Sequence, residues 1–193
     1  MLNKLSTLAA TAAFLALPFA ATAATYELDP AHTWVQFSIN HAGWAQAVGQ
    51  FRTTSGTMEF DPANAAASTL SVTIDAASID TNDAARDEHL RSPDFFNAAE
   101  FPTLTFTATA IEVTGEKTGK ITGDLTMVGV TKPVTLDVTF NAEAPLPWDA
   151  SVVKAGFTAT GSINPGDWGM AKVAEFGLGP DVAITINAEA VKK

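Results

Sequence analysis

Three histidines, His32, His41 and His89, are the residues of this sequence best suited to acid–base chemistry or to metal binding. A metal site needs three or four converging ligands at a recognisable spacing. The sequence contains no cysteine and no pair of histidines one helical turn apart, so we predict no metal site. Each histidine has two interpretations: it binds the polar end of a ligand, or it hydrogen-bonds to loop backbone.

Other residue types that do chemistry are present, but none of them forms a recognisable catalytic set. Carboxylates are numerous, yet most fall in turns or at polar strand positions, and their spacing selects no glycosidase pair. The sequence has neither a Gly-x-Ser-x-Gly elbow nor a glycine-rich phosphate loop. We therefore predict no catalytic residues and no enzymatic activity. The alternative is a hydrolase that acts on an amphiphile with His41 or His89 as the base.

His89 belongs to a charged cluster, 86–91, that must be positioned by a helical insertion at about 81–97. Ser92-Pro93 has the form of a helix cap followed by a proline in the first turn, and it predicts a second short helix. Phe95 and Phe96 are adjacent and cannot face the same way on one helical turn. The insertion therefore needs a covering surface, which neighbouring strands would supply.

Most of the remaining sequence alternates between apolar and polar residues, with threonine prominent on the polar side. This period of two is typical of half-buried antiparallel strands. Glycine, proline, aspartate and asparagine separate the runs and predict turns. We expect about eight or nine strands in a single domain, and the clearest runs are 35–40, 70–75, 103–110, 134–141 and 182–189.

Such strands can close as a two-sheet sandwich or as a barrel. The runs at 103–113, 132–144 and 151–163 exceed the average strand of ~5–6 residues, which favours a tall barrel. Several predicted inward positions are small and would leave space inside: Ala108, Ala110, Ala155, Ala159 and Gly161. The alternative is that the large inward residues Phe106, Phe140 and Phe157 fill this space.

The first 23 residues have the composition of a cleavable signal peptide rather than of the fold. Lys4 precedes an apolar run, Leu8–Ala20, and 21–23 offers the small-x-small pattern of a cleavage site. We therefore predict a signal peptide at 1–23, a barrel domain at 24–193 and a periplasmic location. The net charge of −10 argues against a nucleic-acid partner.

Several motifs, in order along the chain, resemble those of the YceI-like family. They are Tyr26–Thr33, Val35-x-Phe37-x-Ile39-x-His41-x-Gly43 with Gly49-x-Phe51, His89-Leu90-Arg91-Ser92-x-Asp94-Phe95-Phe96-Asn97, Phe101-Pro102-x-Leu104-x-Phe106, Gly123–Thr126, Gly129–Pro133 and Asp167–Met170. The resemblance spans nearly the whole of 24–193. It implies an all-β fold, an extended lipocalin-like antiparallel barrel of about eight strands with a short helical insertion.

The resemblance also implies a function, that of a periplasmic binding or carrier protein that encloses a long isoprenoid lipid, such as a polyprenyl or quinone tail. The expected ligand-binding residues are Val35, Phe37, Ile39, His41, Trp44, Phe51, His89, Phe95, Phe96, Phe106, Phe140 and Phe157. His41 and His89 are expected nearer the opening. No cofactor is expected apart from the bound isoprenoid lipid. A ligand-free, stress-related interaction protein is a further alternative.

The sequence departs from the family pattern at two places where a basic residue is usual. Pro165 and Val48 stand at these positions, and Trp168 replaces a phenylalanine. Within the resemblance, the loss of two basic residues favours a neutral head group, such as a quinone, over a diphosphate. The expected partners are the isoprenoid or a similar amphiphile and, during loading, a transient membrane or membrane-protein contact. The chain is expected to be a monomer or a homodimer.

Overall fold

The computed structural model describes residues 23–193, with only the backbone at Ala174. The predicted signal peptide falls almost entirely outside the described residues and stays a prediction. No helix within the described part of the chain is long and apolar enough to cross a membrane. The strands are β1 (Ala24–Leu28), β2 (Trp34–His41), β3 (Ala45–Phe51), β4 (Thr54–Phe60), β5 (Thr69–Asp75), β6 (Ile79–Asp80), β7 (Thr103–Val113), β8 (Thr118–Met127), β9 (Val130–Leu146), β10 (Asp149–Ile163) and β11 (Leu178–Lys192).

Short helical segments connect some of these strands. They are the 3-10 turns η1 (Pro62–Ala67), η2 (Ala76–Ser78) and η3 (Pro165–Trp168) and the α-helices α1 (Ala84–Arg91) and α2 (Lys172–Glu175).

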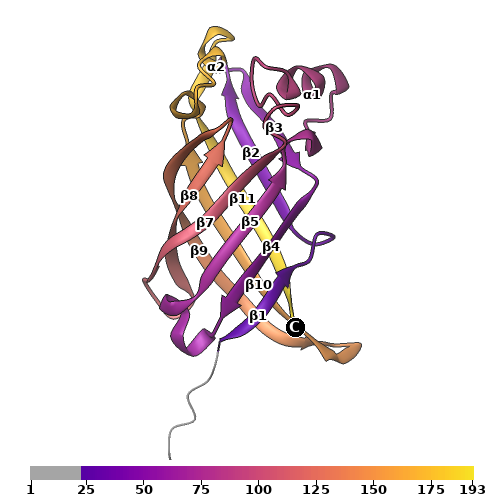
Figure 1. Ribbon diagram of the computed structural model, residues 1–193, viewed down its shortest axis with the longest axis vertical. Coiled ribbons are helices and arrows are strands. Elements are labelled where there is room, and N and C mark those ends of the chain that lie inside the picture. Colours follow the sequence, from indigo (N-terminus) through magenta and orange to yellow (C-terminus); the bar gives the residue numbers. More distant parts are fainter. Residues whose placement is uncertain (1–22) are drawn as a thin grey trace, which may run out of the picture.

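The strands form one antiparallel barrel (Figure 1). Eight of them follow one another in the order β1-β4-β5-β7-β8-β9-β10-β11, and the pairing of β1 with β11 closes the ring. β2 continues the direction of β1 along β11, β3 pairs with β2, and β6 pairs with β3. The pairs β1/β2, β3/β4 and β5/β6 are thus three long strands, each interrupted once. The predicted barrel is confirmed over the sandwich.

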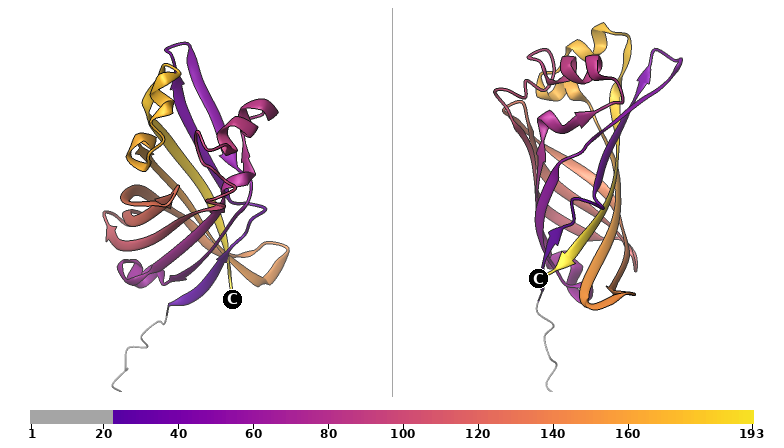
Figure 2. Two further views of the ribbon diagram at one scale, coloured as in Figure 1. Left: turned by 45° about the horizontal axis from the view of Figure 1, so that its top comes forward. Right: turned by 90° about the vertical axis from the view of Figure 1, so that its right-hand side faces the viewer.

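The two ends of the barrel differ (Figure 2). α1, α2 and the tip of the β2–β3 hairpin gather at one end, which we call the mouth. η1, the β9–β10 hairpin and the C-terminus lie at the other end, which we call the base. The long strands therefore separate the helical insertion from the base of the barrel.

The predicted second helix at Ser92-Pro93 is wrong. α1 ends at Arg91, and Ser92 is its C-cap, with its backbone N–H donating to the carbonyl of His89. Pro93 is therefore a proline that follows a helix end, a common stop signal, and not the first residue of a new helix. The chain then turns back on itself, since the N–H groups of Phe95 and Asn97 both donate to the Ser92 carbonyl.

The predicted inward position of Ala110 is also wrong. The register of β7 against β8 shifts between Ala108 and Ala110, which marks a β-bulge. One extra residue reverses the alternation, so Ala110 is exposed and Ile111 faces the interior. A similar register shift in the β9–β10 pair makes Glu143 the partner of buried Ala155, so the two side chains point to the same face of the sheet.

α1 is fixed to the barrel through a buried carboxylate. Asp87 is 8% exposed and accepts hydrogen bonds from the backbone N–H and the hydroxyl of Thr81, at 2.8 and 2.5 Å. Arg86 donates to the hydroxyl and the carbonyl of Thr81, and Arg91 donates to the carbonyls of Ala77 and Ile79. These bonds hold the helix, and with it His89, over the mouth.

Candidate functional site: an apolar cavity inside the barrel

The barrel encloses a cavity of about 520 Å³. Its wall is formed by inward side chains of the strands and by residues of the connecting segments at the mouth and at the base, and most of these side chains are apolar. Cavities of ~300–1,000 Å³ with such linings are typical small-molecule sites. The space inside the barrel is therefore large enough for a hydrocarbon chain.

Glycines explain why the large residues do not fill the interior. Phe37 lies over Gly49 on the neighbouring strand, and Phe106 lies over Gly123. A Cβ atom on Gly123 would be 2.7 Å from Cε2 of Phe106, far closer than side-chain atoms approach. The rings can therefore lie along the wall, because the neighbouring strand presents no side chain at that point.

Aromatic residues cluster at the base of the cavity. Phe60, Phe140 and Phe157 pack with their ring centroids 5.3–5.5 Å apart, and Tyr26 meets Phe60 edge-to-face at 6.1 Å. The hydroxyl of Tyr26 donates to Glu143 at 2.7 Å. Burial, together with this hydrogen bond, raises the pKa of Tyr26 well above its usual value. The expectation that aromatic rings fill the interior thus holds only at this end.

At the mouth, two segments far apart in sequence meet. His89 of α1 packs edge-on against Phe95 and Phe176, with centroids 5.0 and 5.8 Å away. Asp94 forms an ion pair with Lys172 of α2 and lies 3.4 Å from Nε2 of His89. The hydrogen bond from Lys172, with that from His89, lowers the pKa of Asp94 below its usual range. These contacts therefore join the 81–102 insertion to the 164–177 segment, and we call the pairing of Asp94 with Lys172 the latch.

Eleven of the twelve predicted ligand-binding residues line the cavity: Val35, Phe37, Ile39, His41, Phe51, His89, Phe95, Phe96, Phe106, Phe140 and Phe157. Trp44 is the exception, since it lies at the tip of the β2–β3 hairpin and is 86% exposed. Arg91, in the same helix as His89, donates to the backbone carbonyls of Ala77 and Ile79. The binding role of these residues stays a prediction.

Many wall residues were not predicted individually. Most of them occupy inward positions of the alternating strands, so the period-two pattern was the signal that could have found them: Met58, Leu70, Val72, Ile74, Ile121, Leu125, Val134, Leu136, Val138, Ile184 and Ile186. Pro165, Met170 and Val173 come from the segment around η3 and α2, which carries no such pattern. Trp168 is buried there and donates its indole N–H to the Leu125 carbonyl at 3.1 Å.

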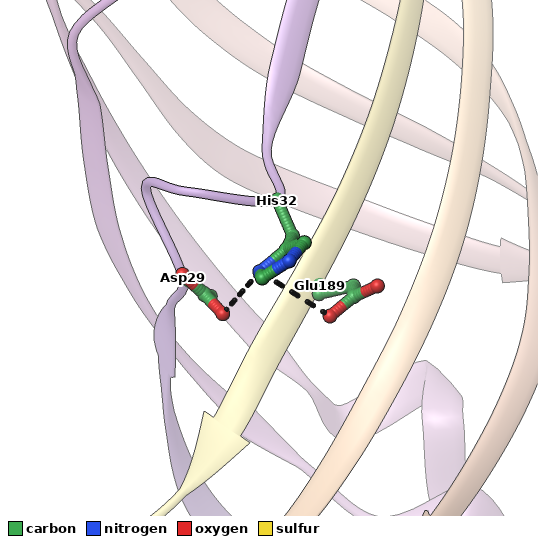
Figure 3. Close-up of side chains that lie close together, drawn as sticks. All are labelled: Asp29, His32 and Glu189. Carbon is green, nitrogen blue, oxygen red and sulfur yellow. Dashed lines mark hydrogen bonds and ion pairs between the residues drawn. The ribbon is translucent and has the colours of Figure 1, made fainter.

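A separate polar cluster lies on the outer face near the base (Figure 3). Asp29, His32 and Glu189 point toward one another, with Nδ1 of His32 2.8 Å from Asp29 and 3.9 Å from Glu189. Lys154 donates to both carboxylates at 2.7 Å. Its ammonium group offsets one of the two carboxylate charges. The hydrogen bond from Lys154, with a smaller one from His32, lowers the pKa of Asp29 to about 2.

Curated relatives cover most of the chain. A UPF0312 protein of Pseudomonas savastanoi pv. phaseolicola is 43% identical over 152 residues, 78% of each chain. Protein YceI of Escherichia coli O157:H7 is 42% identical over 178 residues, 90% of each chain.

Solved structures share the architecture. Burkholderia cenocepacia BcnA superimposes with a TM-score of 0.75 at 25% identity, covering 84% of this chain and 98% of BcnA. A polyisoprenoid binding domain from Saccharophagus degradans superimposes with a TM-score of 0.65 at 16% identity, covering 89% and 99% of the two chains. The sequence also matches the model of the YceI-like domain over residues 26–190. The chain therefore belongs to the YceI-like family.

Proposed function

We propose that this protein is a binding or carrier protein that encloses one long isoprenoid lipid, and that it acts in the periplasm. The continuous apolar cavity is the observation that carries the proposal. Each CH₂ group moved from water into such a cavity is stabilised by ~0.8 kcal/mol, so a chain of tens of carbons binds by burial alone. The Saccharophagus domain of the same fold is named for polyisoprenoid binding, which agrees with this use of the barrel.

The groups at the mouth support binding rather than catalysis. His89 is the best-placed base of the cavity wall, but its ring packs against both Phe95 and Phe176 and its Nε2 faces Asp94. A hydrolase would need this histidine to activate a nucleophile or a water molecule. Replacement of His41 and His89 by alanine separates the two functions, because a hydrolase would lose turnover of lipid esters while a carrier would only change affinity.

We also propose that the mouth meets a lipid bilayer during loading. Trp44 and Phe176 are 86% and 53% exposed there, and Val48 is 63% exposed on the same hairpin. The hairpin, 34–51, has no Asp, Glu, Lys or Arg, although the whole chain carries a net charge of −10. Exposed tryptophan is typical of protein segments that lie at a membrane interface. Because this hairpin carries no carboxylate, it can dock on a zwitterionic membrane without removing water from a charged group.

The binding proposal is tested by placing a charge on the inner face and, separately, on the outer face of the same strand. Phe106 faces the cavity, while its neighbour Thr107 is exposed on the outer face of β7. Phe106→Lys is expected to abolish uptake of a prenyl lipid, because an unpaired charge in an apolar cavity is strongly unfavourable. Thr107→Lys is the matched control and is expected to bind as the unmodified protein does. Equal binding by two folded variants would contradict the proposal.

A further inference from the structure

Three buried threonines belong to the cavity wall: Thr33, Thr54 and Thr81. The hydroxyl of Thr33 donates to the Glu189 carbonyl at 3.3 Å, and that of Thr81 bonds to Asp87 and Arg86. Thr54 differs from both. It is 3% exposed, and its hydroxyl has no hydrogen-bond partner among the described residues.

The strand geometry directs the Thr54 side chain into the cavity. Thr54 begins β4, where the long strand β3/β4 is interrupted, and it shares its facing with Met58 and Phe60 of the cavity wall. Its register partner in β5, Ile74, also lines the cavity. A residue whose buried hydroxyl has no partner among the described residues therefore lines a mostly apolar tube.

A buried hydroxyl without a partner destabilises a fold, and most buried polar groups are hydrogen-bonded. Valine has nearly the same shape as threonine and would fit this site without that cost. The hydroxyl at Thr54 is thus unexplained by the packing of the empty barrel, whereas a polar group on the ligand would explain it.

We propose that Thr54 is a polar subsite for an uncharged oxygen on the bound lipid: a carbonyl, an ether or a hydroxyl. A threonine hydroxyl both donates and accepts, so it can pair with any of these groups. It cannot offset the desolvation of a phosphate, because a buried charge needs a charged partner or several hydrogen bonds. This inference rests on the proposed function and specifies the ligand as a neutral amphiphile whose oxygen lies inside the barrel.

The test compares two probes, a short-tailed prenyl quinone and squalene, a hydrocarbon without oxygen. Thr54→Val is expected to weaken quinone binding by about tenfold, the value of one buried hydrogen bond, and to leave squalene binding unchanged. Thr54→Ser restores the hydroxyl and is expected to restore quinone affinity. The melting temperature of the ligand-free Thr54→Val variant is expected to equal or exceed that of the unmodified protein.

Ser68 is the competing position, because its hydroxyl is also buried without a partner among the described residues and it also lines the cavity, but at the base and in a half-buried residue. Ser68→Ala is expected to bind both probes as before. The subsite proposal is overturned if Thr54→Val binds the quinone normally, if Ser68→Ala is the variant that loses affinity, or if ligand-free Thr54→Val melts lower. If the unmodified protein binds neither probe, the proposed function itself fails.

Discussion

The ring of Phe37 in β2 lies over Gly49, its register partner in β3. A Cβ atom on Gly49 would be 2.8 Å from Cε2 of Phe37 and 2.8 Å from Cγ2 of Thr81. The ring of Phe106 in β7 likewise lies over Gly123 in β8, although Gly123 is a diagonal neighbour and the register partner of Phe106 is Leu125. Two large rings of the cavity wall, Phe37 and Phe106, thus pack over glycines of the neighbouring strand, which leaves space in the lumen above the aromatic cluster at the base.

Gly49→Ala tests this relationship. The added methyl group would push the Phe37 ring into the cavity, so we expect about tenfold weaker lipid binding and a loss of ~1–3 kcal/mol in the free energy of unfolding. Titration with a fluorescent prenyl probe and chemical denaturation measure both effects.

A second substitution and a control identify the cause. Phe37→Leu in the Gly49→Ala chain is expected to recover binding, because the smaller side chain no longer meets the methyl group. Gly156→Ala in β10 is the matched control, since its Cβ would lie no closer than 3.8 Å to any neighbouring atom. Unchanged affinity in Gly49→Ala would show that the Phe37 ring does not limit the cavity.

Asp94→Asn is expected to speed ligand release. The substitution removes the ion pair with Lys172 and weakens the contact with His89, so the two segments over the mouth separate more often. Because these groups are partly exposed, we expect only about a two- to fivefold higher dissociation rate and little change in stability. Stopped-flow release of a prenyl probe measures the rate.

Asp137→Asn is the control for this prediction. It removes the exposed ion pair with Lys120 on the outer wall of the barrel and is expected to leave the release rate unchanged. The latch would be disproved by equal release rates in Asp94→Asn and the unmodified protein.

Two of the exposed tryptophans lie at opposite ends of the barrel and give a direct test of membrane contact. Trp44 lies at the mouth, and Trp148, which is 80% exposed, lies at the tip of the β9–β10 hairpin at the base. We expect Trp44→Ala to reduce binding to phosphatidylcholine vesicles by at least about threefold in flotation assays, and Trp148→Ala to have no effect. Equal losses in the two variants would argue against docking through the mouth.

The cluster around Asp29 predicts a pH dependence of stability. Asp29 faces Lys154, His32 and Glu189, and its pKa in the folded protein is about 2, below the ordinary value of ~3.9. Its contribution is therefore fully present above pH ~4 and is lost as the pH falls toward 2. We expect Asp29→Asn to be less stable by on the order of 1 kcal/mol at neutral pH, after allowance for solvent screening.

Chemical denaturation between pH 2 and 7 checks this expectation, and the curves of Asp29→Asn and the unmodified protein should converge near pH 2. Asp124→Asn, at an exposed position on β8, is the control and should run parallel to the unmodified protein. A constant difference over the whole pH range would contradict the assigned pKa.

The strands were predictable because each has one buried face. The alternation of apolar and polar residues in runs such as 103–110 follows directly from this. Which side chains point inward was predictable only as far as the first β-bulge. The extra residue near Thr109 turns Ala110 outward, and no residue type in that run indicates a bulge. The helix boundary at Ser92 failed for a related reason, because serine followed by proline occurs both at the start of a helix and after its end.

The hollow interior could not be predicted from residue types alone. A phenylalanine such as Phe106 fills a barrel or lines it according to the neighbour beneath its ring, and Gly123 is 17 residues away in the sequence. The latch between Asp94 and Lys172 likewise depends on two segments that only the closed barrel brings together. The unpartnered hydroxyl of Thr54 is visible only once every potential partner has been placed.

The central claim is that the barrel carries a lipid, and mass spectrometry of an organic extract tests it most directly. The protein should be purified from its own host without detergent, so that a native ligand is retained. We predict about one long-chain isoprenoid per protein chain, bearing an uncharged oxygen. Protein that yields no lipid, and that also fails to take up an added prenyl quinone or squalene, would contradict the account.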